Sequence, residues 1–202
     1  MLCLILLAGG VSGLWSFEEA PAGGPPEGFE VISAQSPVGH WVVEQHGGER
    51  VLAQTEATPE DKRGRHSFAI VEGGASGDVV VRVRIKLVSE DGQAGLAFRY
   101  QDLDNHYLMV LDARQRKIRL VRVVDGNRVA IHGQDDVELE TGVWYQLKVR
   151  LRGPAIAVRL HGLRLFDAKD RSLPEDGRIG FFCDDHTRAY FDDLSVVPIE
   201  RD

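Results

Sequence analysis

The feature that most constrains the fold is a strict two-residue alternation of apolar and polar side chains. Over residues 79–88, 147–152 and 156–161, every second side chain is Val, Ile or Leu, and many of those between are Arg or Lys. Because successive side chains of a β-strand point to opposite faces, this period predicts strands with one buried and one polar face. We find no amphipathic helical pattern and no fixed-period repeat, so the sequence predicts an all-β protein.

Turn signals rich in Gly, Asp and Asn separate the apolar segments. They are Glu90–Gly92, Val124–Asn127, Glu140–Gly142, Gly153–Pro154, His161–Gly162 and Asp176–Gly177. Turns at intervals of about 8–12 residues predict an antiparallel sandwich or barrel rather than βαβ units. The chain has 202 residues with 22 Gly and 8 Pro, which fits one large, many-turned β domain.

The N-terminus predicts export. Met1–Ala8 is short and apolar, and it is followed by small residues with a cleavage point expected near Ser12 or Gly13. We therefore expect a signal peptide at residues 1–13 and one mature domain at 14–202, secreted or periplasmic. The alternative is a buried first strand. No later stretch approaches the roughly 20 apolar residues of a membrane span.

Cysteine usage predicts no disulfide. Cys3 lies within the expected signal peptide, before its apolar run. Its removal leaves Cys183 alone in an apolar strand, where we expect a core residue.

The charge distribution excludes nucleic acid as the expected partner. Residues 79–160 carry 14 Lys and Arg against 10 Asp and Glu, whereas the remainder carries 10 against 21, and the net charge is −7. An acidic chain with scattered arginines and no nucleic-acid motif is a poor candidate for binding a phosphate backbone.

An ordered set of short motifs carries a resemblance to a known superfamily. The motifs are Trp15–Glu18, His40–Val43, Gly77–Val83, Gly95–Tyr100, Asp104–Leu108, Gly142–Val149, Gly177–Phe181 and Phe191–Val196. In this order they resemble the concanavalin A-like lectin/glucanase superfamily over nearly the whole expected mature chain. The resemblance implies a two-sheet antiparallel jelly-roll β-sandwich.

Within that superfamily the chain is similar to the 3-keto-disaccharide hydrolase and family-16-like (LamG-like) domains. Those relatives are bacterial exported proteins that bind or act on glycans, so the resemblance implies a carbohydrate partner. Relatives with hydrolase activity carry Glu-x-Gln-x-x-Asp on the strand that corresponds to residues 107–112. Here Tyr107 and Met109 replace the first two residues, and Asp112 alone is left as a candidate catalytic carboxylate.

Four residues are candidates for contact with a sugar. Arg99 is expected on the strand face of Gly95 and Ala97, whose small side chains leave room above the sheet, and a guanidinium can donate several hydrogen bonds to hydroxyls. The alternative is an Arg99 paired with Asp102 or Asp112. Three further candidates are expected on the same rim: Tyr107, Asp185 and His186.

The two ends of the expected mature chain predict a structural calcium site. In carbohydrate-binding jelly rolls of this superfamily, a Glu near the start and an Asp of the last strand hold the ion. Here these are Glu18 and Asp193. Strand parity with Phe191 and Ser195 predicts an inward Asp193, whose burial without a partner would be costly. Calcium prefers hard oxygen ligands, and a hydrogen-bonded structural carboxylate is the alternative.

Three further groups have two interpretations each. Trp41 and Trp144 have side chains that can stack on sugar rings. We expect both to lie in the core instead, because a tryptophan within an apolar strand is more often a core residue. Residues 136–140 place three carboxylates on one face of an expected strand. They could form a catalytic cluster. We expect instead a charged sheet edge that discourages pairing with another sheet. The basic set Arg82, Arg84, Lys86, Lys148, Arg150 and Arg152 balances the acidic flanks or binds an acidic polysaccharide.

Three functional hypotheses follow. The first is a non-catalytic glycan-binding jelly roll, with any chemistry carried by a separate catalytic domain or protein. The second is a glycoside hydrolase that uses Asp112 with an acid from another strand. The third is a structural domain of an envelope assembly.

Overall fold

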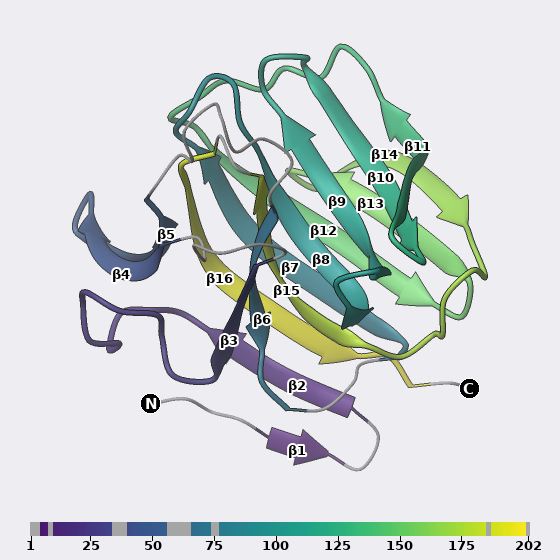
Figure 1. Cartoon of the computed structure of the whole chain (residues 1–202), viewed down its shortest axis with the longest axis horizontal. Coiled ribbons are helices and arrows are strands. Elements are labelled where there is room, and N and C mark those ends of the chain that lie inside the picture. The colour runs from purple at the N-terminus through teal and green to yellow at the C-terminus, as the bar shows by residue number, and fades with distance from the viewer. Residues whose placement is uncertain are drawn as a thin grey trace.

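The fold was analysed on a computed structural model that describes residues 5–7, 10–33, 40–55, 66–73, 77–184 and 187–200. Within these ranges the regular structure consists of β-strands arranged in two antiparallel sheets that pack face to face (Figure 1). The predicted all-β, two-sheet jelly-roll sandwich is therefore confirmed. No helix in the described part of the chain is long and apolar enough to cross a membrane.

The first sheet is nine-stranded and runs in the order β1-β2-β16-β7-β12-β13-β14, with β5 paired to β16 and β4 paired to β5. Its strands are β1 (Ile5–Leu7), β2 (Gly10–Trp15), β4 (Trp41–His46), β5 (Glu49–Gln54), β7 (Val79–Leu87), β12 (Trp144–Arg152), β13 (Ala155–Leu160), β14 (Leu163–Lys169) and β16 (Ala189–Pro198). In Figure 1 the β4–β5 hairpin projects at the left of the molecule, and β1 and β2 lie along its lower edge.

The second sheet is seven-stranded and runs in the order β11-β10-β9-β8-β15-β6-β3. Its strands are β3 (Phe29–Ser33), β6 (His66–Val71), β8 (Gln93–Asp102), β9 (Asn105–Asp112), β10 (Lys117–Val124), β11 (Asn127–Gln134) and β15 (Arg178–Asp184).

The core lies between the two sheets and follows from the alternation in the sequence. In β7 the side chains of Val79, Val81, Val83, Ile85 and Leu87 are all buried, whereas those between them are more exposed. Aromatic rings fill one end of the core, where Phe181 contacts Trp41 and Phe191. Trp41 is 2% exposed and donates its indole N–H to Ser67 Oγ at 2.6 Å, as expected for a core residue. Cys183 is fully buried in the same core, and burial raises the pKa of its thiol well above the usual value.

The first and last strands of the core are neighbours. Trp15 of β2 pairs with Leu194 of β16, and Gly13 pairs with Val196. Both Trp15 and Leu194 are buried in the core. The region predicted as a signal peptide overlaps β1 and the first part of β2, whereas Trp15 falls in the region predicted as mature domain.

Two β-bulges overturn predictions that were based on strand parity. The β8 register shifts between Phe98 and Asp102, and the β16 register shifts between Asp192 and Ser195. Arg99 has φ 48° and Asp193 has φ 51°, both in the left-handed region. The extra residues in each bulge interrupt the two-residue alternation, so side chains within it no longer follow the parity of those before it. Consequently Arg99 does not share the face of Ala97, and Asp193 does not point inward.

The expectation that Trp144 lies in the core is wrong. Trp144 begins β12 on the outer face of the nine-stranded sheet, opposite Lys86 of β7. The guanidinium of Arg84 lies 5.0 Å from the centre of its ring, and Lys86 Nζ lies 5.7 Å from it. Trp144 shares strand parity with Gln146 and Lys148, so its outward direction was available from the sequence.

Candidate functional site

A hollow lies on the outer face of the seven-stranded sheet, which is the face turned away from the nine-stranded sheet. Its floor is a second apolar cluster that is separate from the main core. The cluster contains Phe68, Ile70, Ala97, Tyr100, Leu108, Val110, Val121, Val123 and Phe182. The floor is lowered at Gly95, which has no side chain. Gly95 pairs with Val110 of β9 on one side and with Phe182 of β15 on the other.

Arg128 shows that this face is strongly concave. It is in β11, whereas His66 is in β6, and four strands lie between these two in the sheet. In a flat sheet that spacing would separate them by about 24 Å. Nevertheless Arg128 Nη1 donates to His66 Nε2 at 2.7 Å, and the guanidinium lies 5.5 Å from the centre of the Phe182 ring. The sheet therefore curls around the apolar floor, and Arg128 spans the hollow from its edge.

Two adjoining depressions share Arg128 as a wall. The first, of about 160 Å³, is lined by Gln93, Val110, Asp112, Gln115, Lys117, Arg119, Val121 and Arg128. The second, of about 100 Å³, is lined by His66, Phe68, Leu103, Asp104, His106, Leu108, Val123, Gly126 and Arg128. Together they combine an aliphatic base with planar amide, carboxylate and guanidinium groups, which provide donors and acceptors of several directions.

Asp112, the predicted catalytic carboxylate, lines the first depression and is 7% exposed. Its Oδ2 accepts a hydrogen bond from Gln93 Nε2 at 2.9 Å, and its Oδ1 accepts one from the backbone N–H of Gln115 at 2.8 Å. The backbone N–H of Gln93 in turn donates to Asp184 Oδ1 at 3.2 Å. Asp112, Gln93 and Asp184 therefore form a row across β9, β8 and β15.

The surrounding protein lowers the pKa of two groups that line the hollow, the buried His106 and the exposed Arg128. The pKa of Arg128 is lowered mainly by desolvation, and nearby Asp184 partly offsets this effect. The pKa of His106 is lowered mainly by burial of its ring, which packs against Phe68 and Tyr100. Its Nδ1 lies 3.1 Å from the carbonyl oxygen of Asp102. The folded protein thus favours a neutral His106.

The structure places Arg99 and Tyr107, both predicted to contact a sugar, between the two sheets. Arg99 is 1% exposed, donates from Nη2 to the carbonyl of Gly153, and lies over the Tyr107 ring at 6.0 Å. Tyr107 is fully buried, stacks on Phe98 and donates its hydroxyl proton to Asp170. Burial raises the pKa of Tyr107, and it lowers the pKa of Arg99. Both side chains lie away from the hollow.

The other two predicted sugar contacts, Asp185 and His186, lie outside the described residues. The residues on either side of them are described. Thr187 is buried, and its hydroxyl lies within hydrogen-bond distance of Asp184 Oδ1 and of the Gln93 carbonyl oxygen, to either of which it can donate its one proton. Thr187 therefore lies beside the row of Asp112, Gln93 and Asp184.

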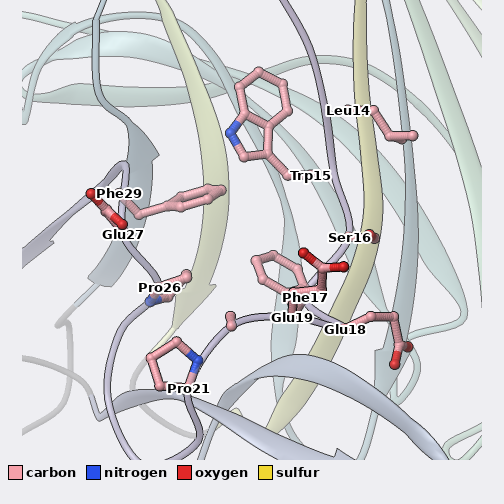
Figure 2. A pocket seen from close by; sticks show the side chains of 11 residues that line it. Leu14, Trp15, Ser16, Phe17, Glu18, Glu19, Pro21, Pro26, Glu27 and Phe29 are labelled. Carbon is pink, nitrogen blue, oxygen red and sulfur yellow. The ribbon is translucent and has the colours of Figure 1, made fainter. Parts of the chain in front are cut away.

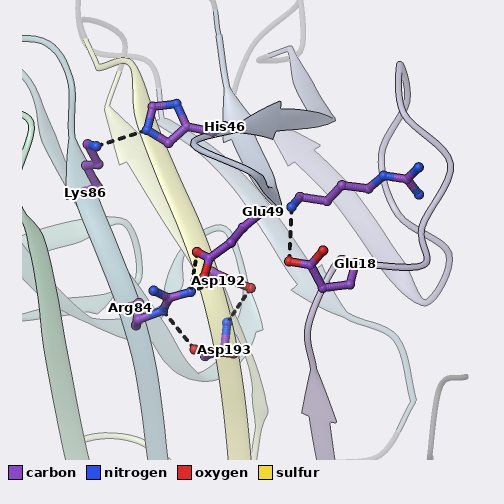
Figure 3. A network of polar contacts seen from close by, with 8 residues as sticks. Glu18, His46, Glu49, Arg84, Lys86, Asp192 and Asp193 are labelled. Carbon is purple, nitrogen blue, oxygen red and sulfur yellow. Dashed lines mark hydrogen bonds and ion pairs between the residues drawn. The ribbon is translucent and has the colours of Figure 1, made fainter.

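Glu18 and Asp193, the predicted calcium ligands, both bind protein groups (Figure 3). Glu18 Oε1 accepts the backbone N–H of Arg50 at 3.1 Å, and Asp193 Oδ2 lies 2.8 Å from Arg84 Nε. Arg84 also pairs with Asp192 at 2.5 Å and with Glu49 at 3.0 Å. A search of the described residues finds no group of three His, Cys, Asp or Glu that could hold a metal. The carboxylates of Glu18 and Asp193, already bound to Arg50 and Arg84, do not fit a calcium ion.

A larger hollow of about 470 Å³ lies between β2 and β3 (Figure 2). Figure 2 shows Trp15, Phe17 and Phe29 grouped within it, and the same three rings are buried in the core. Its polar side chains are those of Ser16, Glu18, Glu19 and Glu27. The lining lacks the amide and guanidinium donors of the hollow on the seven-stranded sheet.

Sequence reasoning missed Arg128 and Gln93, which build much of the candidate site. Arg128 follows the Asp125–Asn127 turn, and nothing in its immediate sequence distinguishes it from other basic residues. Only the curvature of the folded sheet brings it over Phe182. Gln93 precedes Gly95 with the same strand parity, so its place on that face could have been predicted. Residues 136–140 do not form the predicted strand or sheet edge, because they lie in the connection between β11 and β12; Val137 and Leu139 are nevertheless buried between exposed carboxylates.

Comparisons with known proteins identify the fold. No protein-family model matches the sequence, and no curated protein matches it. Among solved structures, a carbohydrate-binding module (CBM66) from Bacillus subtilis has a TM-score of 0.66 at 18% identity, covering 83% of this chain and 94% of the module. A prokaryotic β-1,3-1,4-glucanase (lichenase) from a mouse hindgut metagenome has a TM-score of 0.60 at 12% identity. That match covers 92% of this chain and 98% of the glucanase.

A third similar structure is the exoplasmic/lumenal domain of VIP36 in its Ca²⁺/Man3GlcNAc-bound form. Its TM-score is 0.60 at 12% identity, and the match covers 94% of this chain and 91% of that domain. At these identities the similarity establishes architecture alone. The chain has the jelly-roll fold of the concanavalin A-like lectins and glucanases.

Proposed function

We propose that this protein is an exported glycan-binding domain that holds a saccharide in the hollow of the seven-stranded sheet. The observation that carries the proposal is the composition of that hollow, in which Gln93, Asp112 and Arg128 surround an aliphatic base of Val110 and Val121. The names of the similar structures, a carbohydrate-binding module and a glycan-bound lumenal domain among them, support the same class of ligand.

The chemistry of the hollow matches that of a sugar ring. A pyranose presents C–H groups on its faces and hydroxyls around its edge. The valine side chains offer the faces an apolar contact, and the planar polar groups around them offer each hydroxyl a donor or an acceptor. Asp112 Oδ1 and Oδ2 are already fixed by Gln115 and Gln93, so the carboxylate is oriented before a ligand arrives. The small volume favours a terminal sugar residue over an internal stretch of a polymer.

The test is a glycan array followed by calorimetric titration of the best hits. Asp112→Asn and Arg128→Gln each remove a charge that faces the hollow, and we expect each to weaken binding about tenfold or more, because hydrogen bonds to charged groups contribute about 1.5–3 kcal/mol. Asp167→Asn and Arg164→Gln make the same chemical changes in an exposed ion pair on β14 of the opposite sheet. These two controls should bind like the unmodified protein. Equal affinity of all four variants would exclude the hollow as the binding site.

A second candidate function is glycoside hydrolysis, which the row of Asp112, Gln93 and Asp184 favours. Strands two apart place their backbones about 9–10 Å from each other. Carboxyl groups of inverting glycosidases are about 6.5–9.5 Å apart, which leaves room for a water molecule. The hydrogen bonds from Thr187 and Gln93 hold Asp184 in the row.

Incubation of the array hits with the protein, with detection of new reducing ends, separates the two functions. Under hydrolysis, Asp112→Asn and Asp184→Asn each lower the rate by orders of magnitude while binding persists. If the hits bind and no reducing ends appear, the domain is a binding module, and the chemistry belongs to a separate catalytic domain or protein.

Export is part of the proposal and has its own test. The apolar N-terminal segment supports a signal peptide that ends near Ser12 or Gly13. N-terminal sequencing of the protein recovered from outside the bacterial cytoplasm should then begin near Gly13 or Leu14. An intact Met1 on the recovered protein would contradict this part.

A further inference from the structure

The outer face of the nine-stranded sheet carries a row of four basic residues in direct register. Arg82 of β7 pairs with Lys148 of β12, Lys148 also pairs with Arg159 of β13, and Arg159 pairs with Arg164 of β14. We call these four residues the basic row. At strand spacings of about 4.8 Å the row extends about 14 Å across the sheet. It lies on the opposite sheet from the hollow proposed to bind a saccharide.

Three members of the basic row have no acidic partner. Among the described residues no carboxylate pairs with Arg82, Lys148 or Arg159, whereas Arg164 pairs with Asp167 at 2.6 Å. Like charges directly opposite each other across strands destabilise a sheet. Burial, followed by the charges of Arg82, Arg159 and Arg150, lowers the pKa of Lys148. The fold thus retains an electrostatic cost at this place, although the chain as a whole has a net charge of −7.

The neighbouring cation of the same face provides a contrast. Arg84 is two residues from Arg82 on β7 and is bound by Asp192, Asp193 and Glu49 (Figure 3). Carboxylates thus neutralise Arg84. Among the described residues none is paired with Arg82, two residues away on the same strand, or with Lys148 and Arg159 beside it.

A groove of about 390 Å³ continues the basic row toward β2. Its lining includes the cations Arg82, Arg84 and Lys148, the carboxylate of Asp193, which is paired with Arg84, and Gln146, Ser195 and the exposed Leu14. Ser195 pairs with Arg82, and Leu14 pairs with Ser195, so the groove and the basic row follow one register line across the sheet. The result is a strip with the cations Arg82, Lys148 and Arg159 at one end and Ser195 and Leu14 at the other, and Gln146 lies beside the cations on β12.

We propose that this strip is a second binding site, and that it takes an acidic polysaccharide whose carboxylate or sulfate groups face Arg82, Lys148 and Arg159. A linear polyanion matches a single line of cations, whereas a membrane surface would face a two-dimensional array. Gln146 and Ser195 suit the uncharged hydroxyls of the same chain.

Single-stranded nucleic acid is the less favoured polyanion for this strip. Its binding depends on aromatic side chains on which bases stack. Trp144 is the aromatic residue nearest to the strip on β12, and Arg84 and Lys86 already lie against its ring. A net negative charge also opposes binding to a phosphate backbone outside the strip.

The experiment is calorimetric titration of the full chain with dextran sulfate and with polygalacturonate, beside uncharged dextran as the neutral counterpart. We expect both acidic polymers to bind, with an affinity that falls as salt rises, and dextran not to displace them. The variant Arg82→Gln/Lys148→Gln should lose about tenfold in affinity or more and show a shallower dependence on salt, because fewer counterions are displaced. Both side chains are outside the core, so thermal unfolding should be little changed.

The matched control is Arg171→Gln/Arg188→Gln, which removes the same charge from exposed positions outside the strip. It should keep the affinity of the unmodified protein. Equal losses in the two double variants would assign the binding to net charge and overturn the site. The proposal also fails if neither acidic polymer binds at low salt, or if oligo-dT or phosphatidylglycerol vesicles bind more tightly than both.

Discussion

At the scale of single residues, the polar groups buried in the sandwich determine how the protein responds to its solvent. His106 is 3% exposed, faces the carbonyl of Asp102, and has Arg128 on the same face. Arg99 is a cation held among the acidic groups Asp78, Asp170 and Glu175, which oppose the lowering of its pKa by burial. Because burial shifts the pKa of such groups in the folded state, the free energy of unfolding depends on whether they are protonated.

His106 should make the protein less stable in mild acid. Its pKa in the folded state is lowered below the ordinary value near 6.5, so the folded protein binds fewer protons than the unfolded chain as pH falls. The stability that the neutral ring contributes is present above that value and is lost as pH falls through the folded pKa. Urea unfolding between pH 7.5 and pH 5 measures the effect.

His106→Gln keeps a donor for the Asp102 carbonyl and removes the titration. The decline in unfolding free energy over this pH range should be smaller in the variant than in the unmodified protein. An identical decline in both would assign the acid sensitivity to other groups.

At the scale of strands, much of the fold was predictable because the two-residue period is strong in β7, β12 and β13. The predicted positions failed where a bulge interrupts the period. Arg99 and Asp193 are the residues whose predicted directions failed at a bulge, and both have positive φ within a strand. Left-handed backbone is uncommon for residues other than Gly, and nothing in Phe98–Tyr100 or Asp192–Leu194 marks it. The candidate site was less predictable, because Arg128 enters it through sheet curvature.

Close packing of β8 against β9 requires glycine at position 95. A Cβ at this position would overlap the carbonyl oxygen of Met109, which is backbone and cannot move aside without breaking the pairing. We expect Gly95→Ala to destabilise the protein by about 3 kcal/mol or more, beyond the usual cost of overpacking. Gly77→Ala is the control, since its Cβ would have no atom within 4 Å and its φ is not positive. Chemical denaturation of the two variants should separate them clearly, and similar midpoints would refute the packing argument.

At the scale of the whole molecule, β16 organises the nine-stranded sheet. It pairs with β2, β5 and β7, and it carries Phe191, Leu194 and Val196 into the core. The motif Phe191–Val196, one of those that carry the resemblance, therefore lies in the strand that pairs with β2 near the N-terminus as well as with β5 and β7. Its acidic residues Asp192 and Asp193 bind Arg84.

Trp15 should be the residue through which β2 stabilises the whole domain. It is 2% exposed and packs edge-to-face on Phe29 at 6.4 Å. Trp15→Ala removes a large buried ring and should cost about 3–5 kcal/mol. Leu14→Ala, one residue earlier and 60% exposed, should change stability by less than about 0.5 kcal/mol. Thermal and urea unfolding of this pair give the comparison, and a small effect of Trp15→Ala would show that β2 contributes little to the core.

The antiparallel pairing of β2 with β16 also determines how the domain would respond to mechanical force. Gly13 lies opposite Val196, so the chain enters β2 and leaves β16 at the same end of the sheet. A load that pulls these two points apart acts across the backbone hydrogen bonds at that end and breaks them one after another, as in opening a zipper. The domain would therefore yield at low force from this end, whereas strands loaded along their length would resist together.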